Sequence, residues 1–201
     1  VMSHLTILKK NEVYLQIDSD PHVFYELSDQ FTFELPGAKF MPQYRKRYWD
    51  GKIRLFNVNN GQIYVGLLDK IQKFCKDHEY SYSFVDNEYY GTPFEVNEHI
   101  SHEGVKDYIT SISKYAPRDY QIEGVYDALR HNRKLLISPT ASGKSLMIYS
   151  IVRYYVERGE NTLIVVPTTS LVEQMYKDFA DYGWDVGSFC HKIYAGKERE
   201  T

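Results

Sequence analysis

The sequence has little cysteine and no long apolar run, and both absences narrow the class of protein. Its two cysteines, Cys75 and Cys190, lie far apart and outside any CxxC pattern. This spacing fits reduced, buried thiols better than a disulfide or a metal site. No apolar stretch reaches the ~18 residues that a membrane-spanning helix needs, and the N-terminus has no signal-peptide core. We therefore expect a cytoplasmic protein with no membrane partner.

An excess of positive charge is also absent. The formal net charge of the 201 residues is -3, so any contact with nucleic acid must come from local clusters of cations. Hydrophobic residues make up 43% of the chain, which is enough for one large core or two small ones. We find no internal repeat, and His4, His22 and His78 are too scattered to suggest a metal site.

Residues 1–86 are predicted to form a small α+β domain. Two apolar runs, 5–8 and 13–17, flank a turn-like segment and indicate a hairpin. The whole stretch has the order ββαβββαβ, with a tight turn at Asp50-Gly51. Residues 87–116 are more polar and are interpreted as a linker with one short helix. The inner stripe of that helix is Val105, Tyr108, Ile109 and Ile112.

From residue 117 to residue 201 the pattern alternates between helix and strand. Apolar strands are predicted at 135–137 and 162–166, between helices at 121–130, 146–157 and 171–182. Short, continuously apolar strands separated by helices are typical of a parallel sheet covered on both faces. The expected fold class is therefore a small α+β domain followed by part of an α/β domain.

The segment 138–145, SPTASGKS, follows the first of these strands and opens a helix, as a P-loop does. Main-chain amides at a helix N-terminus suit a triphosphate, and Gly143 allows the backbone to come close. Lys144 is the candidate catalytic residue, and the hydroxyl of Ser145 is a candidate Mg²⁺ ligand. Ser138 stands where the strict pattern has glycine, so an ordinary strand–turn–helix with an exposed lysine is the alternative. ATP and Mg²⁺ are the expected cofactors.

Three segments in the correct order resemble motifs of superfamily-two helicases. Residues 115–121 resemble the Q motif, residues 139–145 resemble motif I, and residues 166–174 resemble motif Ia. Residues 49–55 and 71–75 also resemble a domain that precedes the motor in the family of phage recombination helicases represented by UvsW. The resemblance implies a RecA-like P-loop fold for residues 117–201, a DNA-binding role for residues 1–86, and the host cytoplasm if the source is viral.

The resemblance also implies roles for single residues. Gln121 and Arg118 are expected at the adenine, and Tyr115 packs either on its ring or in the core. Pro167 and Thr168 contact the nucleic-acid backbone or form a plain strand-end turn. The nucleotide-binding residues are then Tyr115, Arg118, Gln121, Thr140, Ala141, Ser142, Gly143, Lys144 and Ser145. Ala141 departs from the glycine that most relatives have.

The acidic Asp-Glu motif that this superfamily needs for hydrolysis does not follow Gln174, and a second motor lobe is absent. We expect a fragment of an ATP-dependent DNA helicase or translocase that acts on branched DNA, inactive by itself. The alternatives are the translocating subunit of a restriction complex and a non-catalytic nucleic-acid-binding module.

Positive charge gathers around two aromatic residues, Tyr48 and Trp49, in the first domain. Cations meet phosphates, and an exposed aromatic ring can stack on an unpaired base. The alternative is a solvated strand face with Trp49 in the core. The predicted nucleic-acid contacts here are Arg45, Lys46, Arg47, Trp49, Lys52 and Arg54.

Overall fold

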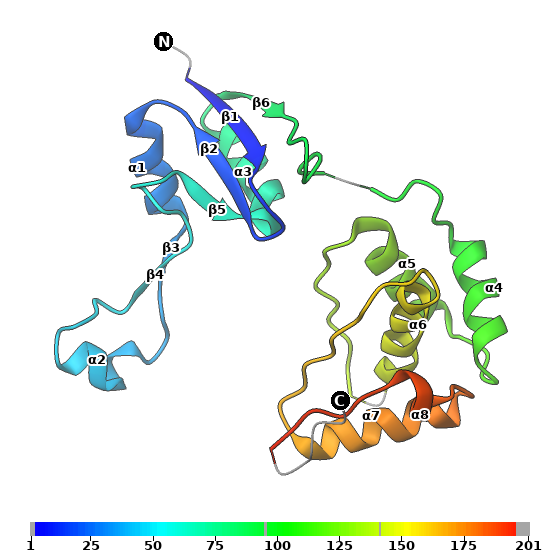
Figure 1. Cartoon of the computed structure of the whole chain (residues 1–201). Coiled ribbons are helices and arrows are strands. Elements are labelled where there is room, and N and C mark those ends of the chain that lie inside the picture. Colours follow the sequence, from blue (N-terminus) through cyan, green and yellow to red (C-terminus); the bar gives the residue numbers. More distant parts are fainter. Residues whose placement is uncertain (1–2, 95, 141, 196–201) are drawn as a thin grey trace. The chain divides into compact units, whose positions relative to one another are not determined.

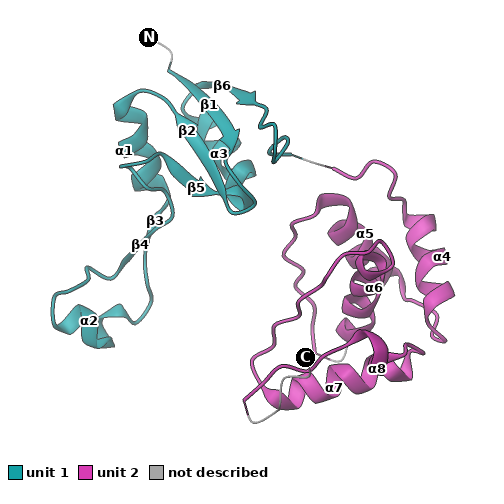
Figure 2. Ribbon diagram, in the orientation of Figure 1, with its two compact units in different colours: residues 1–95 teal, residues 96–201 magenta. Residues whose placement is uncertain are grey.

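The computed structural model describes residues 3–94, 96–140 and 142–195. The chain forms two compact units, residues 1–95 and residues 96–201 (Figure 2). Each unit has a hydrophobic core of its own. Among the described residues, none of the helices has the length and apolar character needed to cross a bilayer.

Unit one is a four-stranded sheet with two helices on one face (Figure 1). Its strands lie in the order β5-β2-β1-β6, and only the β1–β6 pair is parallel. Alternate side chains of β1 and β2 are buried, and they pack in one core with α1 and α3. The elements are β1 (His4–Lys9), β2 (Tyr14–Asp18), α1 (Pro21–Gln30), β5 (Gln62–Tyr64), the short 3-10 helix η2 (Val65–Leu67), α3 (Leu68–Asp77) and β6 (Ser81–Val85).

A two-stranded extension, residues 32–54, leaves this core and is called the arm below (Figure 1). The turn predicted at Asp50-Gly51 does not join neighbouring strands as a hairpin turn would, because β4 (Lys52–Arg54) pairs with β3 (Thr32–Glu34). Between the strands lie the 3-10 helix η1 (Ala38–Phe40) and the short α2 (Pro42–Arg45). Residues 38–50 form the tip of the arm. Gly51, with a φ of +78°, turns the chain back into β4.

Unit two is helical in the part that the structure describes. The three helices predicted from residue 117 onward are confirmed, each within two residues at either end. The helix expected in a linker packs Val105 and Ile109 into the core of this unit. The elements are α4 (His102–Ile112), α5 (Asp119–His131), α6 (Lys144–Val156), α7 (Thr169–Asp181) and the short α8 (Val186–Phe189).

The parallel sheet predicted for unit two is not formed among its described residues, because neither apolar segment becomes a strand. Leu135, Ile137, Leu163 and Val165 remain 78–90% exposed. A strand is stable only when neighbouring strands satisfy its backbone groups, and two strands alone are marginal. The sequence offered only these two candidate strands after residue 117, too few to nucleate a covered sheet.

Candidate nucleotide and nucleic-acid sites

The predicted P-loop lies at the N-terminus of α6, a helix of thirteen residues. Gly143 precedes the helix with a φ of +75°, and a Cβ there would lie 2.3 Å from the side-chain nitrogen of Gln121. Both the left-handed backbone and the lack of space therefore require glycine. Lys144, the first residue of the helix, is exposed, and so is Thr140. Ala141 lies outside the described residues. The helix N-terminus, the ammonium group and the neighbouring hydroxyl form a donor set that suits nucleotide phosphates.

The side chain of Gln121 faces this loop and is only 5% exposed. Its Nε2 donates to the carbonyl oxygens of Ser142 and Gly143, both at 3.2 Å, and its Oε1 accepts from the backbone N–H of Arg118 at 2.9 Å. Both amide hydrogens are thus committed to the loop. Gln121 could contact an adenine only after these bonds open, so in this structure its role is to hold the loop.

Tyr120 strengthens the same connection. Its hydroxyl donates to the carbonyl oxygen of Ser142 at 2.7 Å and accepts from Nη1 of Arg118 at 3.0 Å. No role was predicted for Tyr120 from the sequence. The one feature that could have indicated a role is its position inside the segment that resembles the Q motif. The side chain of Arg118 therefore reaches the loop through a tyrosine.

Ser145 lies in the first turn of α6, and its hydroxyl is paired with another side chain. The Oγ of Ser145 lies 2.7 Å from the hydroxyl oxygen of Tyr182, the residue that ends α7. Burial raises the pKa of the Tyr182 hydroxyl, which favours the neutral phenol. The ring of Tyr115 meets that of Tyr182 edge to face, with centroids 5.8 Å apart. Tyr182 is a second residue that the motifs did not reveal.

The remaining predicted residues of unit two are placed as follows. The hydroxyl of Ser142, a buried residue, pairs with that of Ser138, which stands at the first-glycine position of the motif. Thr168 is the N-cap of α7, and its Oγ1 accepts from the N–H of Leu171 at 3.3 Å. This capping fits the alternative of a strand-end turn. Pro167 is exposed beside it.

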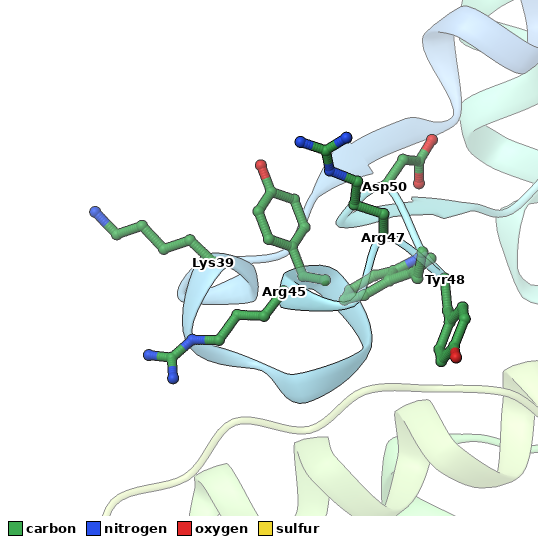
Figure 3. Close-up of a pocket in the computed structure, with 7 residues that line it drawn as sticks. Lys39, Arg45, Arg47, Tyr48 and Asp50 are labelled. Atoms are coloured by element: carbon green, nitrogen blue, oxygen red, sulfur yellow. The ribbon is translucent and has the colours of Figure 1, made fainter.

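The tip of the arm carries an open pocket of about 590 Å³, called the cavity below (Figure 3). Three of the predicted nucleic-acid contacts, Arg45, Arg47 and Trp49, line it. Lys39 and Tyr44, which also line it, were not among the predicted contacts. The full lining is Lys39, Tyr44, Arg45, Arg47, Tyr48, Trp49 and Asp50.

The other cations of the arm lie beside the cavity. Lys46 is exposed and does not line it, and Lys52 and Arg54 are both exposed on β4. The guanidinium of Arg54 binds both carboxylate oxygens of Asp50, at 2.5 and 3.3 Å. These bonds lower the pKa of the Asp50 carboxyl to about 2. The positive charge of Arg54 is therefore already balanced within the arm.

Two family models match the chain, one for each unit. Residues 5–86 match the model described as DNA helicase UvsW, N-terminal. Residues 114–201 match the model described as type III restriction enzyme, res subunit. The order of the two matches agrees with the order of the motifs and of the two cores.

Proteins of phage T4 resemble the chain along most of its length. It is 34% identical over 194 residues to the ATP-dependent DNA helicase uvsW of Enterobacteria phage T4, covering 93% of this chain and 37% of that protein. The crystal structure of the UvsW helicase from bacteriophage T4 has a TM-score of 0.76 and 32% identity, covering 89% of this chain and 64% of that one. The crystal structure of T4 UvsW gives 0.76 and 33%, covering 89% and 36%. The resemblance to a superfamily-two helicase is thereby confirmed.

Proposed function

We propose that this chain, which resembles a superfamily-two helicase and the T4 protein UvsW in particular, is part of an ATP-dependent DNA helicase or translocase. It spans 37% of the length of the curated T4 relative, so the activity belongs to a longer parent. Residues 1–86 act as an accessory DNA-binding domain, and residues 117–201 form part of a RecA-like motor lobe against which α4 packs. The observation that carries the proposal is the Gly143-Lys144-Ser145 turn at the start of α6, tied to the Q-motif segment by Gln121.

The nucleotide is held by residues that lie together around the α6 N-terminus. Lys144 places a positive charge where the β- and γ-phosphates bind, and the helix dipole adds to it. Ser145 supplies a hydroxyl oxygen for the Mg²⁺ ion that accompanies ATP. The ring of Tyr115 contacts that of Tyr182, which supports a role for Tyr115 in packing against the base. Hydrolysis needs carboxylates that the acidic motif supplies in this superfamily, so this chain binds nucleotide without useful turnover.

The DNA contact is made by the arm. Three exposed cations, Lys39, Arg45 and Arg47, surround the cavity at its tip, while Lys46 and Lys52 extend the basic surface. Clustered cations release counterions from the phosphate backbone, which gives affinity despite the net charge of the chain. The natural substrate is branched DNA, as in recombination or replication restart.

Two substitutions separate the nucleotide and DNA roles. Lys144→Ala removes the phosphate-binding ammonium, so it weakens binding of a fluorescent ATP analogue and leaves DNA affinity unchanged. Changing Arg45, Lys46 and Arg47 together to Ala does the reverse. The slope of log affinity against log salt for duplex then becomes shallower by about 2.7 for three lost phosphate contacts.

The matched control removes the same charge from the same unit. Lys70, Lys73 and Lys76 are three exposed lysines of α3, outside the arm. Changing them together to Ala leaves the salt slope close to that of the unaltered chain. An arm variant that behaves like this α3 control rules out the arm as the site of DNA contact.

The match of residues 114–201 to a restriction-enzyme model favours a second candidate, the translocating subunit of a restriction complex. The match of residues 5–86 to the UvsW model favours the helicase. Sequencing the natural gene beyond Thr201 tests the motor reading. We expect an Asp-Glu motif soon after, and a stop codon there favours a non-catalytic binding module instead.

A further inference from the structure

The cavity at the tip of the arm has fixed aromatic walls. The ring of Tyr44 lies against Gly51, where a Cβ would come within 3.0 Å of it, so the turn into β4 has room only for glycine. The indole N–H of Trp49 donates to the carbonyl oxygen of Lys52 at 2.9 Å. That bond sets the orientation of the indole ring. Both rings are thus positioned by backbone that belongs to the arm itself.

A third ring and three cations complete the cavity. Tyr48 is 82% exposed, and Figure 3 shows it on the opposite side of the tip from Lys39 and Arg45. The third cation, Arg47, also lines the cavity. The one acidic group of the lining, Asp50, is neutralised by Arg54. Aromatic faces beside unpaired positive charge match the chemistry of a nucleobase joined to a phosphate.

Building on the proposed contact between the arm and DNA, we propose that this cavity takes one unpaired nucleotide. Its volume of about 590 Å³ falls within the range of small-ligand pockets, about 300–1,000 Å³. The faces of a base inside a continuous duplex are covered by its neighbours, so it could enter only after being extruded from the stack. A bulge, a gap or a fork with a single-stranded arm already offers an unpaired base. The arm therefore selects such points over continuous duplex, while its cations bind the phosphates of either.

The test compares three DNA probes with the full chain at one salt concentration. The first is a duplex with a single bulged 2-aminopurine nucleotide, the second has an abasic bulge in its place, and the third is the continuous duplex. The first two probes carry the same phosphates and differ only in the base. A stacked base contributes a factor of about 5 to 140 in affinity, so the bulged base is expected to bind more tightly than the abasic bulge by that factor. Its 2-aminopurine fluorescence is quenched on binding.

Variants of the rings identify the pocket. Trp49→Leu and Tyr48→Ala are each expected to reduce the preference for the bulged base over the abasic bulge. Tyr48 is highly exposed, so its variant keeps the test sound if Trp49→Leu disturbs folding. The control is Tyr89→Ala, which removes an 88% exposed tyrosine outside the arm and leaves the preference intact.

The outcomes separate this inference from the proposed function. Equal affinity for the base and abasic bulges, together with a salt slope that still depends on Arg45, Lys46 and Arg47, overturns the pocket and keeps the arm as a DNA contact. Quenching that is unchanged in both ring variants also overturns the pocket. A salt slope that is independent of the three cations overturns the DNA contact itself.

Discussion

The hydroxyl of Tyr182, at the end of α7, lies 2.7 Å from the Oγ of Ser145, in the first turn of α6. This bond joins the candidate magnesium ligand to the end of the helix that begins within the motif Ia segment. Tyr182 is held from another side by the ring of Tyr149, whose centroid is 5.1 Å away. The orientation of the Ser145 hydroxyl is therefore set partly by a residue far along the chain, and a metal ion bound there would have to share that hydroxyl with the tyrosine.

Tyr182→Phe is expected to tighten binding of Mg²⁺–nucleotide. Phenylalanine keeps the ring contacts and removes only the hydroxyl, so Ser145 becomes free to turn toward the ion. One hydrogen bond contributes about 0.5–1.5 kcal/mol, which corresponds to a gain of about 2- to 13-fold in affinity. Titration with a fluorescent ATP analogue measures the gain in Mg²⁺, and the same titration in EDTA shows none. Tyr25→Phe, at an exposed tyrosine of unit one, is the control. An equal gain with and without Mg²⁺ contradicts the competition.

Gly143→Ala is expected to destabilise unit two by two separable effects. The left-handed backbone costs about 1–2 kcal/mol for a residue with a Cβ, and displacing the Gln121 amide adds about 1–3 kcal/mol. In a Gln121→Ala background only the first cost remains. Urea unfolding of the four proteins gives the coupling between the two sites. All four proteins carry Trp49→Phe, which leaves Trp184 of unit two as the only tryptophan, so that tryptophan fluorescence follows the unfolding of unit two. Identical costs of Gly143→Ala in both backgrounds show that the amide does not confine the loop.

The helices and most strands could be predicted from local pattern alone. Periodic apolar side chains predicted α5, α6 and α7, and two apolar runs on either side of a turn-like segment predicted β1 and β2. The arm could not be predicted in this way. Its strands β3 and β4 pair across a long insertion, and the dipeptide Asp50-Gly51 has the sequence of a hairpin turn. The prediction of two strands in unit two was wrong for a different reason. An apolar run becomes a buried strand only where partner strands are present to pair with it and cover it.

The Asp50 carboxyl is expected to titrate near pH 2 in the intact chain. Its pKa is lowered first by the bonds from Arg54 and then by the backbone N–H of Lys52, so the ion pair is complete above the unfolded pKa and is lost as the pH falls through about 2. In Arg54→Gln the main cause is removed, and the pKa rises toward its ordinary value. Carboxyl ¹³C chemical shifts followed by NMR measure both titrations. A variant that still titrates near pH 2 assigns the shift to the backbone instead.

The exposed apolar segments of unit two are expected to promote self-association. Ile137→Lys with Val165→Lys places charge on two side chains that are 90% and 84% exposed. Light scattering then falls, and the free energy of unfolding changes by less than about 0.5 kcal/mol, as for ordinary surface positions. Asn161→Lys adds charge at a neighbouring polar position as a control. A loss of stability well above that value means that the two segments are paired in solution.

The sequence predicts the type of each candidate site, and it does not predict the side-chain contacts within it. The sequence of residues 138–145 was enough to identify the candidate loop because the residues of the motif are consecutive in the chain. They could not show that Gln121 binds the loop or that Tyr182 reaches Ser145, because both contacts join segments more than twenty residues apart. The basic stretch likewise indicated a cationic surface, yet Arg54 is balanced by Asp50 and Lys39 comes from a separate turn.

The two strands of the arm leave the body of unit one beside each other. The N–H of Leu55 bonds the carbonyl oxygen of Phe31, and that of Leu35 bonds the carbonyl oxygen of Gly51, both at 2.9 Å. An insertion that begins and ends at one pair of neighbouring strands can be shortened, replaced or transplanted without a change in the fold of the rest of the domain. The arm, which we propose contacts DNA, is consequently free to change in sequence while the sheet and helices that carry it stay the same.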